Sequence, residues 1–169
     1  MKQPDDHAQG LTAPLCTSKA PPRIERVEFS IVTKADCALV WRIFSDCRLW
    51  NSFANIYGTI TWRGEPWVAG SRLRIEVLRP AVAVQERVIT VCTPPRCVAW
   101  ISHISGYTIE QWVLLDPNPL GGTKISVWLE FTGAGLSVNL QEMRGLVQGL
   151  MNQWFQNLAA QCDRLARSV

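Results

Sequence analysis

Residues 138–167 read VNLQEMRGLVQGLMNQWFQNLAAQCDRLAR, and this stretch decides the fold of the chain. Apolar side chains recur along it at spacings of three and four residues, which predicts one long amphipathic helix. Its apolar face combines a central stripe with a flanking one: Met143, Val147, Leu150, Trp154 and Leu158, then Leu146, Met151, Phe155, Cys162 and Leu165. Such a helix must bury that face against another layer, so a sheet large enough to hold it is expected elsewhere in the chain.

Alternation of apolar and polar residues before the helix predicts that sheet. Arg72–Val77 shows it most clearly, with apolar and charged side chains taking turns. The expected strands are Ile24–Ile31, Tyr57–Arg63, Arg72–Val77, Val84–Cys92, Cys97–His103, Tyr107–Leu115 and Thr123–Thr132. Two short helices are expected after the first strand, one starting near Thr33–Asp36 and one after Ser45-Asp46. This order indicates an α+β fold with an antiparallel sheet covered on one face.

Length and composition limit the class of protein. The 169 residues suit one domain, and only 18% are charged, below the globular average of roughly 25%. The net charge of +3 is not gathered into a Lys/Arg run, which argues against a nucleic-acid partner. No apolar run approaches the roughly 20 residues that span a bilayer, so the protein is not expected to cross a membrane.

The termini and cysteines add expectations about location and metals. Residues 1–23 contain four prolines and no repeating pattern, so we expect a disordered leader followed by one domain over residues 24–169. The N-terminus has no apolar signal-peptide core, and six cysteines without a Cys-x-x-Cys pair suggest reduced thiols in the cytoplasm. With only two histidines besides, neither a metal site nor a cofactor is expected.

Six short phrases resemble the START-like helix-grip superfamily, also called SRPBCC or polyketide cyclase/dehydrase-like. They are Val40–Asp46, Trp50–Phe53, Gly70–Leu73, Pro94–Trp100, Gly122–Lys124 and Phe131–Gly133. The resemblance implies a curved antiparallel sheet of about seven strands wrapped around a long C-terminal helix, with two short helices after strand 1. It also implies a ligand cavity between sheet and helix, because members include lipid-transfer domains, plant hormone binders and polyketide aromatase/cyclases.

The chain departs from a bacterial subgroup of that superfamily at two places. Where the subgroup often has Glu-His, this chain reads Glu110-Gln111. Where the subgroup often has Gln and Glu on the inward face of the last strand, this chain has Val127 and Leu129. These differences imply a more apolar cavity with less capacity for acid–base chemistry.

Strand and helix periodicity predicts which side chains face that cavity. The expected ligand-binding residues are Trp50, Phe53, Leu73, Ile75, Val77, Trp100, Ser102, Tyr107, Ile109, Gln111, Val113, Val127, Leu129, Met143, Leu146, Leu150 and Trp154. A mainly apolar wall with a few polar groups is typical of a small-molecule site. The alternative is a filled core that contains the same residues.

Few polar residues are candidates for chemistry. Tyr107, Gln111 and Ser102 are expected to orient a polar ligand head, and Tyr107 is a weak candidate for a proton acceptor. By strand parity His103 faces away from the cavity, as do Glu110 and Glu130. Arg74 and Arg87 are expected on the solvated face of the sheet. They would reach an anionic ligand in the cavity only if the expected strand register is off by one residue.

Three functions remain open. The leading hypothesis is a binding module for a hydrophobic or amphipathic small molecule such as a lipid, polyketide or aromatic compound. The second is a polyketide cyclase/dehydrase-type enzyme acting in the same cavity. The third is a partner-binding protein, including a homodimer, that uses the outer sheet face and the leader. Trp62, Trp67, Trp112 and Trp128 are expected to face outward on the sheet or to lie in loops.

Overall fold

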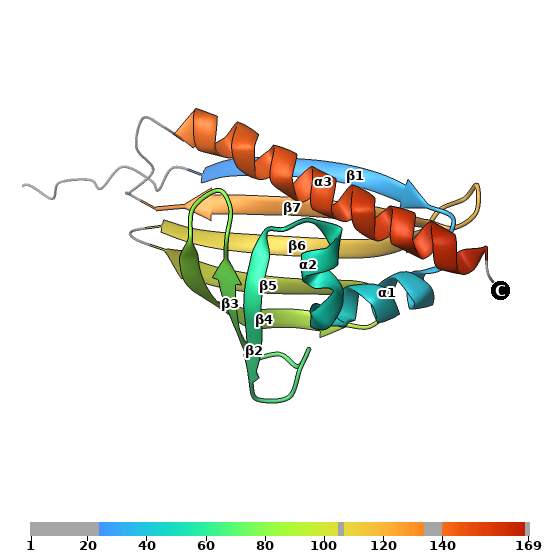
Figure 1. Ribbon diagram of the computed structural model, residues 1–169, viewed down its shortest axis with the longest axis horizontal. Helices are drawn as coiled ribbons and strands as arrows, with labels where there is room; N and C mark the ends of the chain where they lie inside the picture. The colour runs from blue at the N-terminus through green and yellow to red at the C-terminus, as the bar shows by residue number, and fades with distance from the viewer. Residues whose placement is uncertain (1–23, 105–106, 134–139, 168–169) are drawn as a thin grey trace, which may run out of the picture.

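The computed structural model describes residues 24–104, 107–133 and 140–167, and Figure 1 shows the arrangement of the elements. The strands are β1 Ile24–Thr33, β2 Tyr57–Arg63, β3 Arg72–Val77, β4 Ala83–Thr93, β5 Cys97–Ile104, β6 Tyr107–Pro117 and β7 Thr123–Thr132. The helices are α1 Cys37–Ser45, the short 3₁₀ turn η1 Cys47–Leu49, α2 Trp50–Phe53 and α3 Leu140–Ala166. The expected elements are all present, with ends that differ by a few residues.

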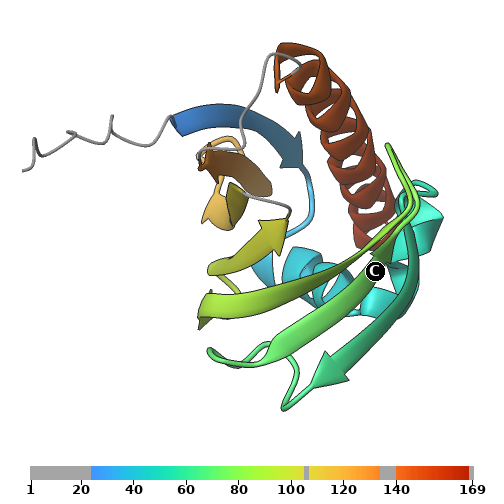
Figure 2. The ribbon, with the colours of Figure 1, turned by 90° about the vertical axis from the view of Figure 1, so that its left-hand side faces the viewer.

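One antiparallel sheet holds all seven strands, in the order β1-β7-β6-β5-β4-β3-β2. Seen from the side, the sheet curls, and α3 lies along its open, concave side between β1 and the β2–β3 edge (Figure 2). The helix-grip α+β architecture expected from the sequence is therefore confirmed. No helix in the described part of the chain is long and apolar enough to cross a membrane.

Strand alternation places the inner face of the sheet as predicted in β3 and β7. In β7 every second residue is buried, from Thr123 through Ile125, Val127 and Leu129 to Phe131. In β3 the buried residues are Leu73, Ile75 and Val77, whereas Arg72 and Arg74 are exposed and Glu76 is half-buried. This alternation turns one apolar face toward α3 and leaves charged side chains on the other.

Short polar caps fix the two short helical segments after β1. The Asp36 side chain accepts a hydrogen bond from the backbone N–H of Leu39 at 2.7 Å and so starts α1. Asp46 accepts from the N–H of Arg48 at 3.1 Å and starts η1. A capping carboxylate satisfies an N–H group that has no partner inside the helix. The aspartate expected to begin the second segment does so.

An aromatic cluster fixes the C-terminal half of α3. The ring of Trp154 lies 5.0 Å from Phe53 and 5.4 Å from Trp50, centroid to centroid, and that of Phe155 lies 5.8 Å from Phe29. The indole N–H of Trp154 donates to the carbonyl of Trp50 at 2.9 Å. Such rings bury large apolar areas and satisfy their polar edges at the same time. This half of the helix is thus packed solidly against the sheet and the short helices.

A carboxylate near the end of α3 adds a polar anchor to the same half. Asp163 accepts hydrogen bonds from the Thr33 hydroxyl and from the backbone N–H of Lys34, the latter at 2.7 Å. Hydrogen bonds to an ionised acceptor are stronger than neutral ones. The end of β1 is therefore tied to the last turns of α3.

The expected leader, residues 1–23, lies outside the described residues. The domain predicted over residues 24–169 stays a prediction as a unit.

We expect Gly122→Ala to destabilise the protein more than Gly121→Ala. Both glycines have positive φ, +80° and +96°, which costs an alanine about 1–2 kcal/mol. A Cβ on Gly122 would also collide with the backbone carbonyl of Thr33, whereas one on Gly121 meets nothing within 4 Å. Denaturant unfolding should show at least about twice the loss at Gly122. Equal losses would contradict the close approach.

Candidate functional site

A cavity of about 250 Å³ lies between the first half of α3 and the inner face of the sheet. The helix contributes Val147, Leu150 and Met151. The sheet, the turn between β3 and β4 and the residue before β2 contribute the rest: Ile56, Tyr57, Val77, Arg79, Pro80, Ala81, Ala83, Gln85, Arg87, Trp100, Ser102, Ile109, Gln111, Leu129 and Phe131. The β3–β4 turn reaches toward α3 in both ribbon views (Figures 1 and 2). The wall is mostly apolar, as in small-molecule sites.

Seven residues of the expected ligand-binding set line this cavity. They are Val77, Trp100, Ser102, Ile109, Gln111, Leu129 and Leu150. Another seven belong to the solid core instead: Trp50, Phe53, Leu73, Ile75, Val113, Val127 and Trp154, each buried without lining the cavity. The aromatic cluster explains the difference, because it fills the space between α3 and the sheet at that end. Periodicity identifies the inner face but not which part of it stays open.

Two predicted residues lie outside what the structure describes at the level of side chains. Tyr107 begins β6 and Met143 lies in the first turns of α3, but only their backbone is described. Their proposed roles, including that of Tyr107 as a proton acceptor, stay predictions.

The inward placement expected for Leu146 is wrong. Its side chain is 51% exposed and does not line the cavity. Successive residues are turned by about 100° around an α-helix, so Leu146 lies well to one side of Val147. The apolar stripe in the sequence of α3 is therefore wider, on this side, than the face that the helix buries.

The expected solvent exposure of Arg87 is also wrong. Arg87 is 6% exposed and lines the cavity, whereas Arg74 on β3 is exposed as predicted. On β4 the inward residues are Gln85, Arg87 and Ile89. Apolar residues occur on both faces of this strand, and its pairing with β5 shifts between Ile89 and Val91. Alternation alone therefore gave no clear face for β4.

Two aromatic rings hold the Arg87 guanidinium inside the cavity. Its central carbon lies 5.3 Å from the ring centroid of Tyr57 and 5.3 Å from that of Trp100. Contact of a cation with ring faces is favourable, and more so when water is excluded. Ser102 lies directly opposite Arg87 in the β4–β5 pairing, and Gln111 lies opposite Trp100 in the β5–β6 pairing. These side chains form the polar part of the cavity wall.

Two nitrogens in this polar part have no hydrogen-bond partner among the described residues. They are Nη1 of Arg87 and Nε2 of Gln111, both buried. Both are donors, so the group that would satisfy them is an acceptor. Buried polar atoms in native structures are nearly always paired, and exceptions at a cavity point to a ligand or water.

Groups that exchange protons near neutral pH are scarce around the cavity. Its wall, as far as the structure describes it, includes no His, Asp or Glu. His103 is exposed and lies 3.1 Å from the Thr108 hydroxyl, and Glu110 accepts from the Trp112 indole, so both follow the predicted outward parity. No group of three or more His, Cys, Asp or Glu side chains that could hold a metal gathers within the described ranges.

Comparison with known proteins agrees with this geometry. The profile of the family described as "Polyketide cyclase / dehydrase and lipid transport" matches residues 25–163. The chain belongs to this family. The resemblance inferred from the six sequence phrases is thereby confirmed, at the level of the family and its fold. A search of curated protein sequences finds no significant match.

Solved structures show how widely the fold is shared. The crystal structure of Ara h 8.0201 has a TM-score of 0.69 at 12% identity and covers 83% of this chain and 98% of its own. Norcoclaurine synthase from Thalictrum flavum, in complex with dopamine and hydroxybenzaldehyde, has a TM-score of 0.66 at 9% identity. The match covers 92% of this chain and 95% of the synthase chain. The di-domain ARO/CYC BexL of the BE-7585A biosynthetic pathway has a TM-score of 0.64 at 15% identity. The match covers 83% of this chain and 49% of the BexL chain. At these identities the likeness shows the fold alone.

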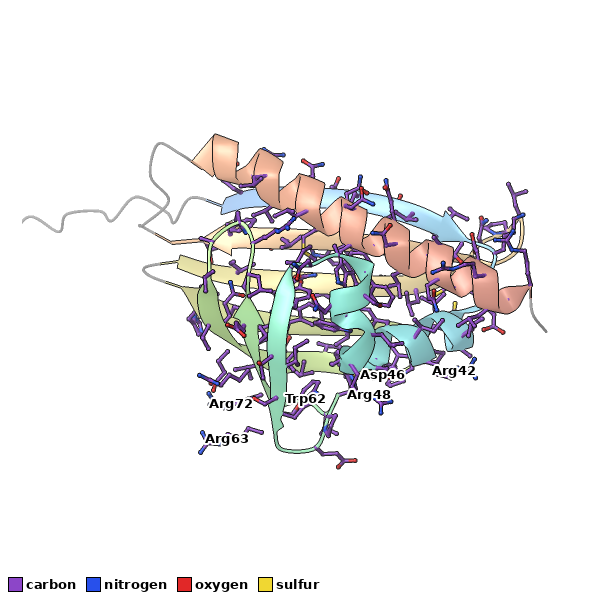
Figure 3. The ribbon with its side chains drawn as sticks, viewed as in Figure 1. Arg42, Asp46, Arg48, Trp62, Arg63 and Arg72 are labelled. Atoms are coloured by element: carbon purple, nitrogen blue, oxygen red, sulfur yellow. The ribbon has the colours of Figure 1, made fainter. Side chains whose placement is uncertain are left out.

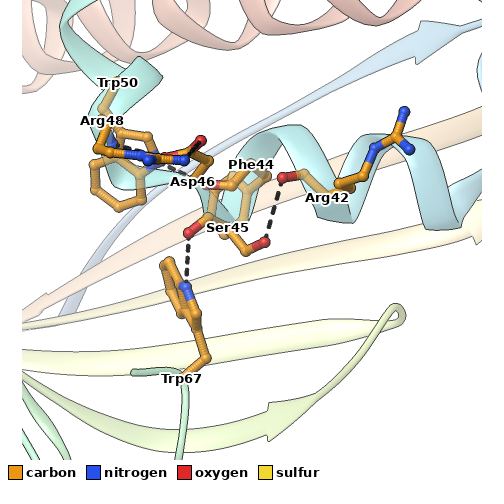
Figure 4. A network of polar contacts seen from close by, with 7 residues as sticks. All are labelled: Arg42, Phe44, Ser45, Asp46, Arg48, Trp50 and Trp67. Atoms are coloured by element: carbon orange, nitrogen blue, oxygen red, sulfur yellow. Dashed lines mark hydrogen bonds and ion pairs between the residues drawn. The ribbon is translucent and has the colours of Figure 1, made fainter. Parts of the chain in front are cut away.

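A second, more exposed hollow lies beneath α1, η1 and the start of β2. Its wall includes Cys47, Trp62 and Trp67. The indole N–H of Trp67 donates to the Ser45 carbonyl at 2.8 Å, as Figure 4 shows. Trp67 has a φ of +62°, unusual for a non-glycine residue, and this hydrogen bond helps to hold it there. The hollow therefore has a firmly positioned aromatic wall.

The charged groups around the second hollow are largely compensated or point away. Arg48 pairs with Asp46 at 2.7 Å and, through its side-chain hydrogen bonds, lowers the pKa of that carboxyl. Arg72 pairs with Glu86, and Arg63 and Arg72 point away from the sheet in Figure 3. Burial raises the pKa of the Cys47 thiol to about 12, so it is not an activated nucleophile. This hollow lacks the chemistry of a catalytic site.

We expect Cys47 and Cys162 to resist alkylation in the folded protein. Burial raises the pKa of each thiol to about 12, above the ordinary value of about 8.5, so at pH 8.5 both are almost fully protonated. Iodoacetamide labelling followed by peptide mass spectrometry should modify them only after denaturation. Labelling of Cys162 at the same rate in native buffer and in urea would contradict its burial.

Proposed function

We propose that this protein binds a hydrophobic or amphipathic small molecule in the cavity between the sheet and α3. The observation that carries the proposal is the contrast between the two halves of α3. Trp154 and Phe155 pack solidly on the aromatic cluster, whereas Val147, Leu150 and Met151 face open space. A cavity left beside a solid core is a specific feature, since protein interiors are otherwise close-packed.

The size and lining of the cavity support a small ligand. Its volume of about 250 Å³ is slightly below the range of roughly 300–1,000 Å³ that ligand pockets span, so the ligand must be small. Burial of apolar ligand surface contributes about 25 cal/mol per Å² to affinity. Arg87, Ser102 and Gln111 would orient a polar end of the ligand. Family membership agrees with binding of a hydrophobic molecule.

A cyclase/dehydrase-type reaction in the same cavity is the second candidate. The donors on Arg87 and Gln111 favour it, because they are suited to stabilise negative charge on a carbonyl oxygen. Such a reaction also needs a positioned proton acceptor. The described wall offers only the hydroxyls of Ser102 and of Tyr57, and the latter donates to the sulfur of Met151 at 3.6 Å. Binding is therefore the better-supported function.

The outer sheet face supports partner binding less well. Trp112 and Trp128 stack at 5.6 Å, and the guanidinium of Arg26 lies 5.1 Å from the Trp128 ring. These tryptophans are only partly exposed, because each ring covers apolar surface of the other. The outward placement expected for Trp62 is wrong: it lies opposite the inward-facing Leu73, and its ring lies 5.0 Å from that of Trp67. Trp67 lies in the loop after β2, and its ring packs against the core, 5.5 Å from Phe44.

The first experiment is native mass spectrometry of the protein purified from cells, followed by denaturing extraction. A stoichiometric hydrophobic molecule that leaves on denaturation is the expected result. A purified protein that carries no molecule, and whose thermal unfolding is unchanged across a library of small hydrophobic compounds, would contradict the binding function.

Leu150→Trp should abolish ligand binding, because the larger side chain fills the cavity from the helix side. Leu146→Trp is the matched control: it adds the same volume one turn earlier on α3, where the side chain is 51% exposed and outside the cavity. Isothermal titration calorimetry with the co-purified molecule measures both. Retention of binding by Leu150→Trp, with normal unfolding, would show that the ligand lies elsewhere.

A further inference from the structure

We propose that the ligand is an anion, a small and largely apolar carboxylic acid whose carboxylate is held by Arg87 and Gln111. This inference rests on the proposed binding function and specifies its ligand class. Both side chains line the cavity and are more than nine-tenths buried, with exposures of 6% and 3%.

Arg87 brings a positive charge into the cavity wall. A guanidinium stays protonated at any physiological pH, so Arg87 places a full positive charge inside the protein. The ion pairs found among the described residues involve Arg26, Arg48, Arg72 and Arg144, and none involves Arg87. A buried charge without a counter-ion is strongly unfavourable. A ligand carboxylate would supply the missing counter-charge.

No side chain of the cavity wall replaces that counter-ion within the described part of the chain. The wall contains no Asp or Glu there. The Cys47 thiol is close enough to feel the charge of Arg87, but burial raises its pKa to about 12, so it stays neutral. Among the described residues the acceptor position beside Arg87 is therefore left open to a ligand.

The geometry around Arg87 leaves it ready to donate. Tyr57 and Trp100 each lie 5.3 Å from its central carbon and contact the guanidinium. The N–H groups of a guanidinium lie in its own plane, so ring contacts leave them free for an acceptor. Nη1 has no partner. The rings thus restrain the side chain and reduce the conformational entropy that binding would cost.

Gln111 supplies a second donor from the neighbouring part of the sheet. Its Nε2 is buried and unpaired, and it lies opposite Trp100 across β5–β6. A carboxylate has several acceptor positions, so it can satisfy Gln111 and Arg87 together. A ligand amine would be repelled by Arg87, and a purely apolar ligand would leave both donors unsatisfied. The apolar remainder of the wall favours an acid with a hydrocarbon or aromatic body.

The test compares acids with amides of the same shape. The probes are 3-phenylpropanoate and octanoate against 3-phenylpropanamide and octanamide, measured by isothermal titration calorimetry at pH 7.5. We expect the wild-type protein to bind at least one acid ten or more times more tightly than its amide. Arg87→Met, which keeps the length but removes the charge, should weaken acid binding at least tenfold and change amide binding less than threefold.

Two further variants sharpen the result. Gln111→Glu keeps the shape but places a carboxylate in the same cavity wall as Arg87, so it should abolish acid binding and spare amide binding. Arg74→Met is the matched control, since Arg74 is exposed on the outer face of β3. It removes the same charge from the protein and should leave acid binding unchanged. Thermal unfolding of each variant confirms that it is folded.

The outcomes separate this inference from the binding function. Equal affinity for acid and amide, or an equal loss of acid affinity in Arg87→Met and Arg74→Met, would overturn the proposed carboxylate site at Arg87 and Gln111. Binding of a hydrophobic molecule in the cavity would not be affected by that result. Binding of no probe by the wild-type protein would overturn the assignment of small carboxylic acids. If the co-purified molecule is then neutral and Leu150→Trp removes it, the cavity is still a binding site.

Discussion

The packing of α3 on the aromatic cluster is the contact on which the rest of the structure depends. Trp154 lies against Trp50 and Phe53, and its indole N–H is satisfied by the Trp50 carbonyl. This joins the short helices after β1 to the last element of the chain. Because the C-terminal half of α3 is fixed there, its first half can lie across the curved sheet without filling it. The cavity is the consequence of a helix held firmly at one end.

The two halves of α3 differ in sequence as well as in packing. The first half includes Gly145 and Gly149, where an added Cβ would meet nothing within 4 Å. A glycine inside a helix costs roughly 0.5–1 kcal/mol relative to alanine. The second half carries the aromatic residues and the Asp163 anchor. Stabilising contacts are thus concentrated away from the cavity, and the segment that covers the cavity is held less strongly.

The fold could be predicted from the sequence because its signals are local and repetitive. The three- and four-residue spacing of α3 and the alternation of β7 each give one face; that of β7 is buried as expected, and that of α3 is buried except on the flank that carries Leu146. Which part of that face stays open could not be predicted. Leu73 and Leu129 have the same pattern, yet only Leu129 reaches the cavity. The difference depends on how far the rings of the aromatic cluster extend, and this is set by contacts between distant segments.

Alternation gives no clear face for β4, and the sequence expectation places Arg87, the residue that matters most for the candidate site, on the wrong face. Arg87 breaks the rule that charges face solvent, and no ion pair among the described residues offsets it. Natural sequences are consistent at most positions, so a local rule broken at a costly position indicates selection for something other than stability. A carboxylate that pairs with Arg87 would turn this unfavourable charge into the main source of ligand selectivity, and apolar contacts with Leu129 and Leu150 would supply affinity.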